Sequence, residues 1–240
     1  MLEKFEKLQI VSLGLLVALS LIISTKIITK NFNNNVISVT GSAYEIVKSD
    51  SGVLNFDINI KRLNKQEAYN TSKTQVKIVE EYLKQKQIKN IELKTVNGYY
   101  SYKRNSKTGE YTDIPDMYNL TQPISISSDN VELIKEISND ITGLITKGVD
   151  INVYSPSYDY SKLPELKVSL LEKASKDAKE RATSMLKPTH NSVGKIQSVR
   201  MGVYQITPID STSVSDMGIN DTSSIDKKVT AVANVSFKIK

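Results

Sequence analysis

The stretch Ala-Ser-Lys-Asp-Ala-Lys-Glu-Arg-Ala, residues 174–182, places an alanine at every fourth position. Residues four apart share one face of an α-helix, so the alanines lie in the middle of an apolar stripe. The stripe consists of Leu171, Ala174, Ala178, Ala182 and Met185. Because its middle is small, another backbone can approach closely, whereas Asp177 and Arg181 are spaced for a surface ion pair. We therefore interpret this helix, which follows Pro164, as a packing element and not as a catalytic or ligand-binding one.

Upstream of this helix, the periodicity of apolar residues predicts six elements. Alternation from Val53 to Ile60 is typical of a half-buried strand, and helical spacing follows Asn64, a suitable N-cap. A second helix follows Asp129 or Asn130 and ends before Gly148. The expected elements are a strand at 53–62, a helix at 65–87, strands at 91–103 and 117–126, a helix at 131–147 and a strand at 149–154.

This order of elements, βαββαβ, is that of a ferredoxin-like unit, in which helices cover one face of an antiparallel sheet. Beyond it we expect the alanine-rich helix and two closing strands, at 195–206 and 227–240. Between those strands, residues 208–226 are rich in Ser, Thr and Asp and predict a mobile loop. The predicted fold class is α+β, with one compact domain over residues 36–240.

The amino-terminal part contains an apolar run, LQIVSLGLLVALSLII at residues 8–23, with no charge before Lys26. About 20 apolar residues can cross a hydrocarbon core of roughly 30 Å, so we expect a transmembrane anchor at residues 8–28. A cleaved signal peptide, with Ala18-Leu19-Ser20 as its only cleavage triplet, and a buried helix are the alternatives. The anchor would follow a cytoplasmic segment, residues 1–7, and precede a polar linker, residues 29–35.

Composition excludes several classes of function. The chain has no cysteine, which removes disulfides, thiolate metal sites and cysteine nucleophiles. Its net charge of +6 comes mostly from lysines interspersed with acidic residues, so nucleic-acid binding is not expected. No glycine-rich phosphate-binding motif follows a strand, so no nucleotide cofactor is predicted.

Three short motifs resemble those of penicillin-binding serine enzymes. They are Lys107-Thr108-Gly109, Ser128-Asp129-Asn130 and the S-x-x-K pairs Ser184/Lys187, Ser192/Lys195 and Ser224/Lys227. In that class S-x-x-K comes first and K-T-G last, because the nucleophile opens a helix and K-T-G lies on a later strand. The order here is reversed, so we interpret the matches as chance in a chain rich in Ser and Lys.

Other titratable residues give no ordered site. His190 is the only histidine and has no identifiable nucleophile partner, so we expect an exposed loop residue. Carboxylates gather in two loops, and weak calcium binding there is conceivable, but neither loop has the dense spacing of a calcium loop. These carboxylates are Asp113 and Asp116, and then Asp210, Asp216, Asp221 and Asp226. We predict no catalytic residue, metal or cofactor.

Tyrosines cluster around the expected hairpin between 91–103 and 117–126. They are Tyr99, Tyr100, Tyr102 and Tyr111. Tyrosine suits both a packed sheet face and a protein interface, since its ring is apolar and its hydroxyl polar. We favour sheet packing, and a protein interface is the alternative.

Several separated blocks resemble the SIMPL family of exported bacterial proteins, from about residue 36 to residue 240. The most specific is 174–182, which resembles the family's A-x-x-D-A-x-x-K-A helix, with Gly194-Lys195-Ile196 opening the next strand. Residues 37–43 (ISVTGSA) resemble the opening strand and glycine turn, and residues 148–151 (GVDI) a later block. Ala43 and Ser49 stand where the family usually has a second glycine and a proline.

The resemblance implies an extracytoplasmic location, formation of oligomers, ring-like in some members, and an association with stress tolerance or cell-envelope integrity. It supplies no catalytic residue to carry over. We therefore expect a non-enzymatic protein anchored in the cytoplasmic membrane, with its carboxy-terminal domain outside, that forms homo-oligomers and binds an unknown protein partner. The alternative is an extracytoplasmic hydrolase or ligand carrier with an unrecognised site.

Overall fold

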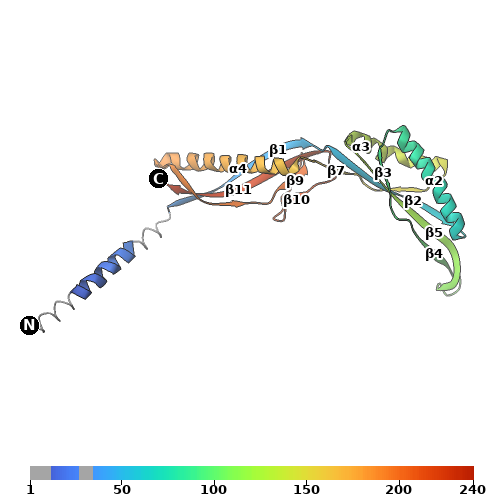
Figure 1. Cartoon of the computed structure of the whole chain (residues 1–240), viewed down its shortest axis with the longest axis horizontal. Helices are drawn as coiled ribbons and strands as arrows, with labels where there is room; N and C mark the ends of the chain where they lie inside the picture. Colours follow the sequence, from blue (N-terminus) through green and yellow to red (C-terminus); the bar gives the residue numbers. More distant parts are fainter. Residues whose placement is uncertain (1–11, 27–34) are drawn as a thin grey trace, which may run out of the picture. The chain divides into compact units, whose positions relative to one another are not determined.

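The computed structural model describes residues 12–26 and 35–240, and their contacts divide the chain into two compact units (Figure 1). The first unit holds the described residues up to Ser42, Leu171–Gly202 and Val232–Lys240, and the second holds Ala43–Leu170 and Val203–Ala231. Three long elements contribute residues to both units: β1 (Val36–Lys48), α4 (Leu163–Leu186) and β11 (Asp226–Ile239).

A six-stranded sheet forms much of the second unit. Its strand order is β3-β5-β2-β6, with β4 also pairing β5 and β7 also pairing β2. Its strands are β2 (Ser51–Arg62), β3 (Asn90–Leu93), β4 (Asn97–Arg104), β5 (Tyr111–Ser128), β6 (Ile151–Val153) and β7 (Ser157–Asp159). All of these pairings are antiparallel. The chain order and the strand order are together those of a ferredoxin-like unit.

The pairing of β2 with β5 sets the register of this sheet. It runs without a bulge from Gly52 opposite Ser128 to Arg62 opposite Tyr118. Every second residue of β2 is buried, as the alternation in the sequence predicted. The buried side chains, Leu54, Phe56, Ile58 and Ile60, therefore lie on one face.

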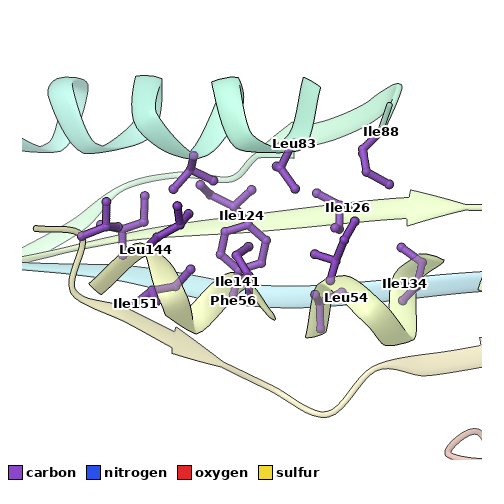
Figure 2. Packing of buried hydrophobic residues seen from close by; sticks show 14 of the residues in the cluster. Leu54, Phe56, Leu83, Ile88, Ile124, Ile126, Ile134, Ile141, Leu144 and Ile151 are labelled. Carbon is purple, nitrogen blue, oxygen red and sulfur yellow. The ribbon is translucent and has the colours of Figure 1, made fainter. Parts of the chain in front are cut away.

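Two helical segments cover that face. Helix α2 (Lys65–Gln85) begins at Asn64, whose Oδ1 accepts a hydrogen bond from the backbone N–H of Glu67 at 2.8 Å, as an N-cap requires. Helix α3 (Val131–Asp140) continues into the 3-10 segment η1 (Ile141–Lys147) and stops at Gly148. Figure 2 shows Leu83 and Ile88 on one side, and Ile134 and Ile141 on the other, meeting Phe56 and Ile124 in one apolar cluster.

A second sheet has the strand order β1-β11-β9-β10, with β8 also pairing β11. Its further strands are β8 (Val193–Met201), β9 (Gln205–Pro208) and β10 (Ile219–Asn220), and β9 and β10 are parallel. Within the second unit, Leu166 and Leu170 of α4 pack on a group of strand residues. That group is Val47, Ile206, Val229 and Ala231.

The first unit confirms the packing role of the alanine stripe. Ala174, Ala178 and Ala182 are fully buried. Gly41 of β1 lies so close that a Cβ on it would overlap the backbone of Ala174 and Ala178. The carboxylate of Asp177 accepts hydrogen bonds from the backbone N–H of Ser42 and from Nε of Arg181, both at 2.8 Å. The predicted Asp177–Arg181 ion pair is therefore present, and the same carboxylate also binds the backbone of Ser42 in β1.

The predicted fold class is wrong in two respects. The strands form two sheets instead of one, because β1, β8, β9, β10 and β11 pair among themselves. The expected transmembrane helix at residues 8–28 is also not found: within residues 12–26 and 35–240, no helix is long and apolar enough to cross a membrane. The expected segment 1–7 and most of the linker 29–35 lie outside the described residues.

One predicted closing strand is two strands. The expected strand at 195–206 is interrupted at Gly202, whose N–H donates to the carbonyl of Val232 at 2.9 Å. A side chain at Gly202 would crowd Val232, so the strand breaks where the chain passes close to its neighbour. Strands β8 and β9 then pair different parts of β11.

Candidate interaction surfaces

A hairpin formed by β4 and the first part of β5 carries the clustered tyrosines. Its turn is closed by Asn105, whose N–H donates to the carbonyl of Glu110 and whose Oδ1 accepts from the N–H of Lys107, at 2.8 and 2.9 Å. Gly109 has a φ of 74°, which glycine adopts without strain. Asn105 and Gly109 are thus turn-forming residues at the two positions where the hairpin turn requires them.

Most of these tyrosines are not packed on the sheet. Tyr100 meets Tyr118 edge to face, with ring centroids 4.8 Å apart. Tyr99, Tyr102 and Tyr111 are 67%, 47% and 72% exposed. The favoured interpretation, sheet packing, is therefore wrong for these three side chains. They form an exposed aromatic surface, which we call the tyrosine hairpin.

Strand β8, in the first unit, is an edge strand with an apolar row. Ile196, Val199 and Met201 lie opposite Phe237, Val235 and Ala233 of β11. Opposite residues of an antiparallel pair point to the same face, and the three β11 side chains are buried. The three β8 side chains are instead 59%, 49% and 54% exposed. Among the described strands β8 pairs only β11, so its other edge also presents unpaired backbone groups.

The residues resembling a serine enzyme do not form a site in the structure. Lys107, Thr108 and Gly109 form the hairpin turn, whereas Asn130 is the N-cap of α3 and accepts from the N–H of Leu133 at 3.2 Å. Ser184 donates to the carbonyl of Glu180 in its own helix, and the backbone of Ser192 pairs with Lys240. Each motif therefore has a local structural role.

The single histidine and the loop carboxylates lie mostly in turns and strands at the surface. His190 is exposed and ends the 3-10 turn η2 (Lys187–Thr189) with a φ of 57°. Asp113 and Asp116 lie in β5 and not in the hairpin tip. Within the described ranges, no group of three or more His, Asp or Glu side chains is placed to hold a metal ion.

One buried charged group was noted in the sequence only as part of an S-x-x-K pair, and its burial was not predicted. Lys227 is only 3% exposed, and its Nζ donates to the carbonyl of Asp221 at 2.5 Å. Burial lowers the pKa of Lys227, against the opposing charges of Asp221 and Asp159. Lys227 precedes Val229 and Ala231 on β11 by two and four residues. Because side chains of a strand alternate between its faces, this spacing predicts that Lys227 also points inward.

The carboxylate of Asp221 is held by its own turn. Its Oδ1 accepts from the N–H and hydroxyl of Ser223, at 2.8 and 2.7 Å, and from the N–H of Ser224. Burial alone would raise the pKa of Asp221, but these hydrogen bonds outweigh it and lower the pKa. Lys227 and Asp221 thus fasten the segment before β11 to the sheet, which is a structural role for the third S-x-x-K pair.

Comparison with known proteins gives one finding. Residues 37–237 match the model of a family described as SIMPL, protein of unknown function (DUF541). No curated protein matches the chain. The matched residues include both exposed surfaces and the alanine-rich helix.

Proposed function

The chain belongs to the SIMPL family, and from this premise we propose that it is a non-enzymatic protein that assembles with copies of itself and with a partner outside the cytoplasm. The observation that carries the proposal is the row of Ile196, Val199 and Met201 on an unpaired strand edge. The proposed role in cell-envelope integrity or stress tolerance rests on the family resemblance alone.

The edge of β8 is suited to pairing with another strand. Exposed strands in monomeric proteins are usually protected by inward charges, proline or a covering element. Strand β8 has Lys195 and Arg200 but no proline, and it is nine residues long. A second strand added at this edge would satisfy backbone groups and bury the apolar row in one step.

The tyrosine hairpin supports the same proposal independently, within the second unit. Tyrosine is enriched at protein interfaces because its ring offers rigid contact area at a low cost in conformational entropy. Arg104 lies over the ring of Tyr111, with its guanidinium carbon 5.1 Å from the ring centroid. Arginine and tyrosine together are typical of residues that dominate binding energy.

A non-enzymatic role is favoured by what the sequence supplies. Catalysis at neutral pH usually needs a positioned acid, base, nucleophile or metal. The chain has no cysteine and one histidine, and that histidine is exposed in a turn. A hydrolytic activity of the full chain that His190→Ala abolishes would contradict this part of the proposal.

Sedimentation velocity of the full chain over a wide range of concentration tests the assembly. We expect species larger than the monomer, lost when Ile196 and Val199 are both replaced by lysine, since charge on an edge opposes strand addition. Ile145→Lys is the matched control, because Ile145 is 57% exposed and lies on η1, which is part of neither β8 nor the hairpin. A monomer at every concentration would refute self-association.

A further inference from the structure

A hollow of about 500 Å³ opens on the second sheet, within the second unit. Its floor is formed by side chains of β1, β9 and β11, and its wall by the segment after β9. The floor residues are Tyr44, Ile46, Gln205, Thr207, Lys228 and Thr230. On β11 the neighbours of Lys228 and Thr230, namely Val229 and Ala231, pack against α4. The hollow therefore lies on the face of the sheet that α4 does not cover.

The wall is fastened by a buried amide. Gln205, only 8% exposed, donates through Nε2 to the carbonyl of Ser215 at 2.7 Å and accepts from the N–H of Ser215 at 3.3 Å. Lys228 adds a hydrogen bond from Nζ to the carbonyl of Ser211 at 3.1 Å. The segment carrying Ile209 and Val214 is thus fixed on both sides of the hollow, which preforms its shape.

The lining combines four apolar or aromatic side chains, six uncharged polar ones and one cation. Ile46, Ile209 and Val214 line the hollow and are 53%, 38% and 81% exposed. Three apolar side chains therefore face solvent in the hollow, where an apolar ligand could cover them. The ammonium of Lys228 has only the carbonyl of Ser211 as a partner, and no carboxylate of the described chain lies within ion-pair distance of it. One positive charge therefore lies beside the apolar side chains of the hollow without a carboxylate of the described chain to neutralise it.

We propose that this hollow binds a small amphipathic carboxylate. The apolar chain of the ligand lies against Ile46, Ile209 and Val214, and its carboxylate pairs with the Lys228 ammonium. A cationic amphiphile would be repelled by the lysine charge, and a sugar would leave Ile46, Ile209 and Val214 without an apolar partner. A phosphate monoester is a poorer match, because the lining offers a single lysine and no arginine for bidentate contact.

Octanoate binding to the full chain, measured by calorimetry, tests the proposal. We expect saturable binding of octanoate, and binding of octyltrimethylammonium at least tenfold weaker, because their chains match and their charges oppose. Lys228→Met should weaken octanoate binding about tenfold or more, since it removes the charged partner but keeps the apolar stem. Lys238→Met, also on β11 and exposed, should bind octanoate like the wild type.

A measurement that needs no variant accompanies the calorimetry. Octanoate should shift the backbone amide resonances of Thr207 and Thr230 in the hollow more than those of Thr183 and Ser184 on α4. Absence of octanoate binding, equal binding by Lys228→Met, or equal affinity for the cationic amphiphile would overturn the proposal. These outcomes can be distinguished from a failure of self-association. The wild-type chain is assayed for octanoate at a concentration where sedimentation has already shown whether it is a monomer or an assembly.

Discussion

Gly41 lies against the backbone of Ala178, at a separation that leaves no room for a side chain on the strand. Helix α4 and strand β1 can approach this closely because the helix contributes alanine and the strand contributes glycine. The same pair explains why the spacing of alanines in the sequence predicts the packing of this helix so well. It also locates a place where added side-chain atoms should disturb the packing of the first unit.

Replacing Ala178 with leucine should lower the free energy of unfolding by roughly 1–3 kcal/mol, because added methylenes in a closely packed contact force the backbones apart. Urea unfolding of the full chain measures the change. Met185→Leu is the control on the same helix, since Met185 is 60% exposed and should tolerate the change within about 0.5 kcal/mol. An Ala178→Leu variant as stable as the wild type would show that the helix can move away from Gly41.

Two neighbouring tyrosines of the hairpin should respond differently to truncation. Tyr100→Ala should lower stability by about 1 kcal/mol, because it removes the edge-to-face contact with the buried ring of Tyr118. Tyr99→Ala should change stability by less than about 0.5 kcal/mol, since its side chain is 67% exposed. Thermal unfolding of both variants tests this, and a loss of equal size would mean that Tyr99 is packed.

The buried Lys227 should make stability depend on pH. Its pKa is lowered from the ordinary value of 10.5, so at pH values between the two pKa values the unfolded chain binds more protons than the folded chain. Below the pKa of Lys227 in the folded chain, the free-energy cost of burying its charge is fully present. This cost is relieved as the pH rises from that pKa toward 10.5, because the buried amine loses its proton. Stability of the wild type relative to Lys227→Met should therefore increase with pH in this range.

Urea unfolding of the wild type and of Lys227→Met at several pH values from neutral upward gives that difference directly. Lys238→Met is the control, because Lys238 is exposed on the same strand. A difference between wild type and Lys227→Met that stays constant with pH would show that Lys227 titrates alike in both states.

Location is tested in cells and not in the purified chain. If the chain works outside the cytoplasm, added protease should degrade it in intact cells from which the wall has been removed. A cytoplasmic protein in the same sample must stay intact, as a check on the membrane. Protection of the chain until the cells are lysed would contradict the proposed location.

The parts of the fold that were predictable from sequence are those set by local periodicity. The alternation in β2, the N-cap at Asn64 and the alanine stripe each depend on residues a few positions apart, and each is present in the structure. The division into two sheets depends on which distant strands pair with β11, and periodicity carries no information about partners. The break at Gly202 likewise follows from its contact with Val232, a neighbour only in space.

The candidate surfaces were predictable only in part. The tyrosine cluster is visible in the sequence, but its exposure depends on how little of the chain covers the hairpin. The apolar row of β8 is indistinguishable in sequence from a buried strand, because Ile196 and Val199 would serve either purpose. Lys227 could have been identified, since an isolated lysine in step with Val229 and Ala231 indicates an inward position.

The unbroken pairing of β2 with β5 limits how the length of this chain can change. Deleting one residue between Leu54 and Ile60, or between Leu120 and Ile126, would turn every side chain beyond the deletion to the opposite face. Polar groups such as Asn55 and Thr121 would then enter the core, while isoleucines moved to the surface. We expect insertions to be tolerated instead at the turn from 105 to 110, where a longer loop alters no pairing in either strand.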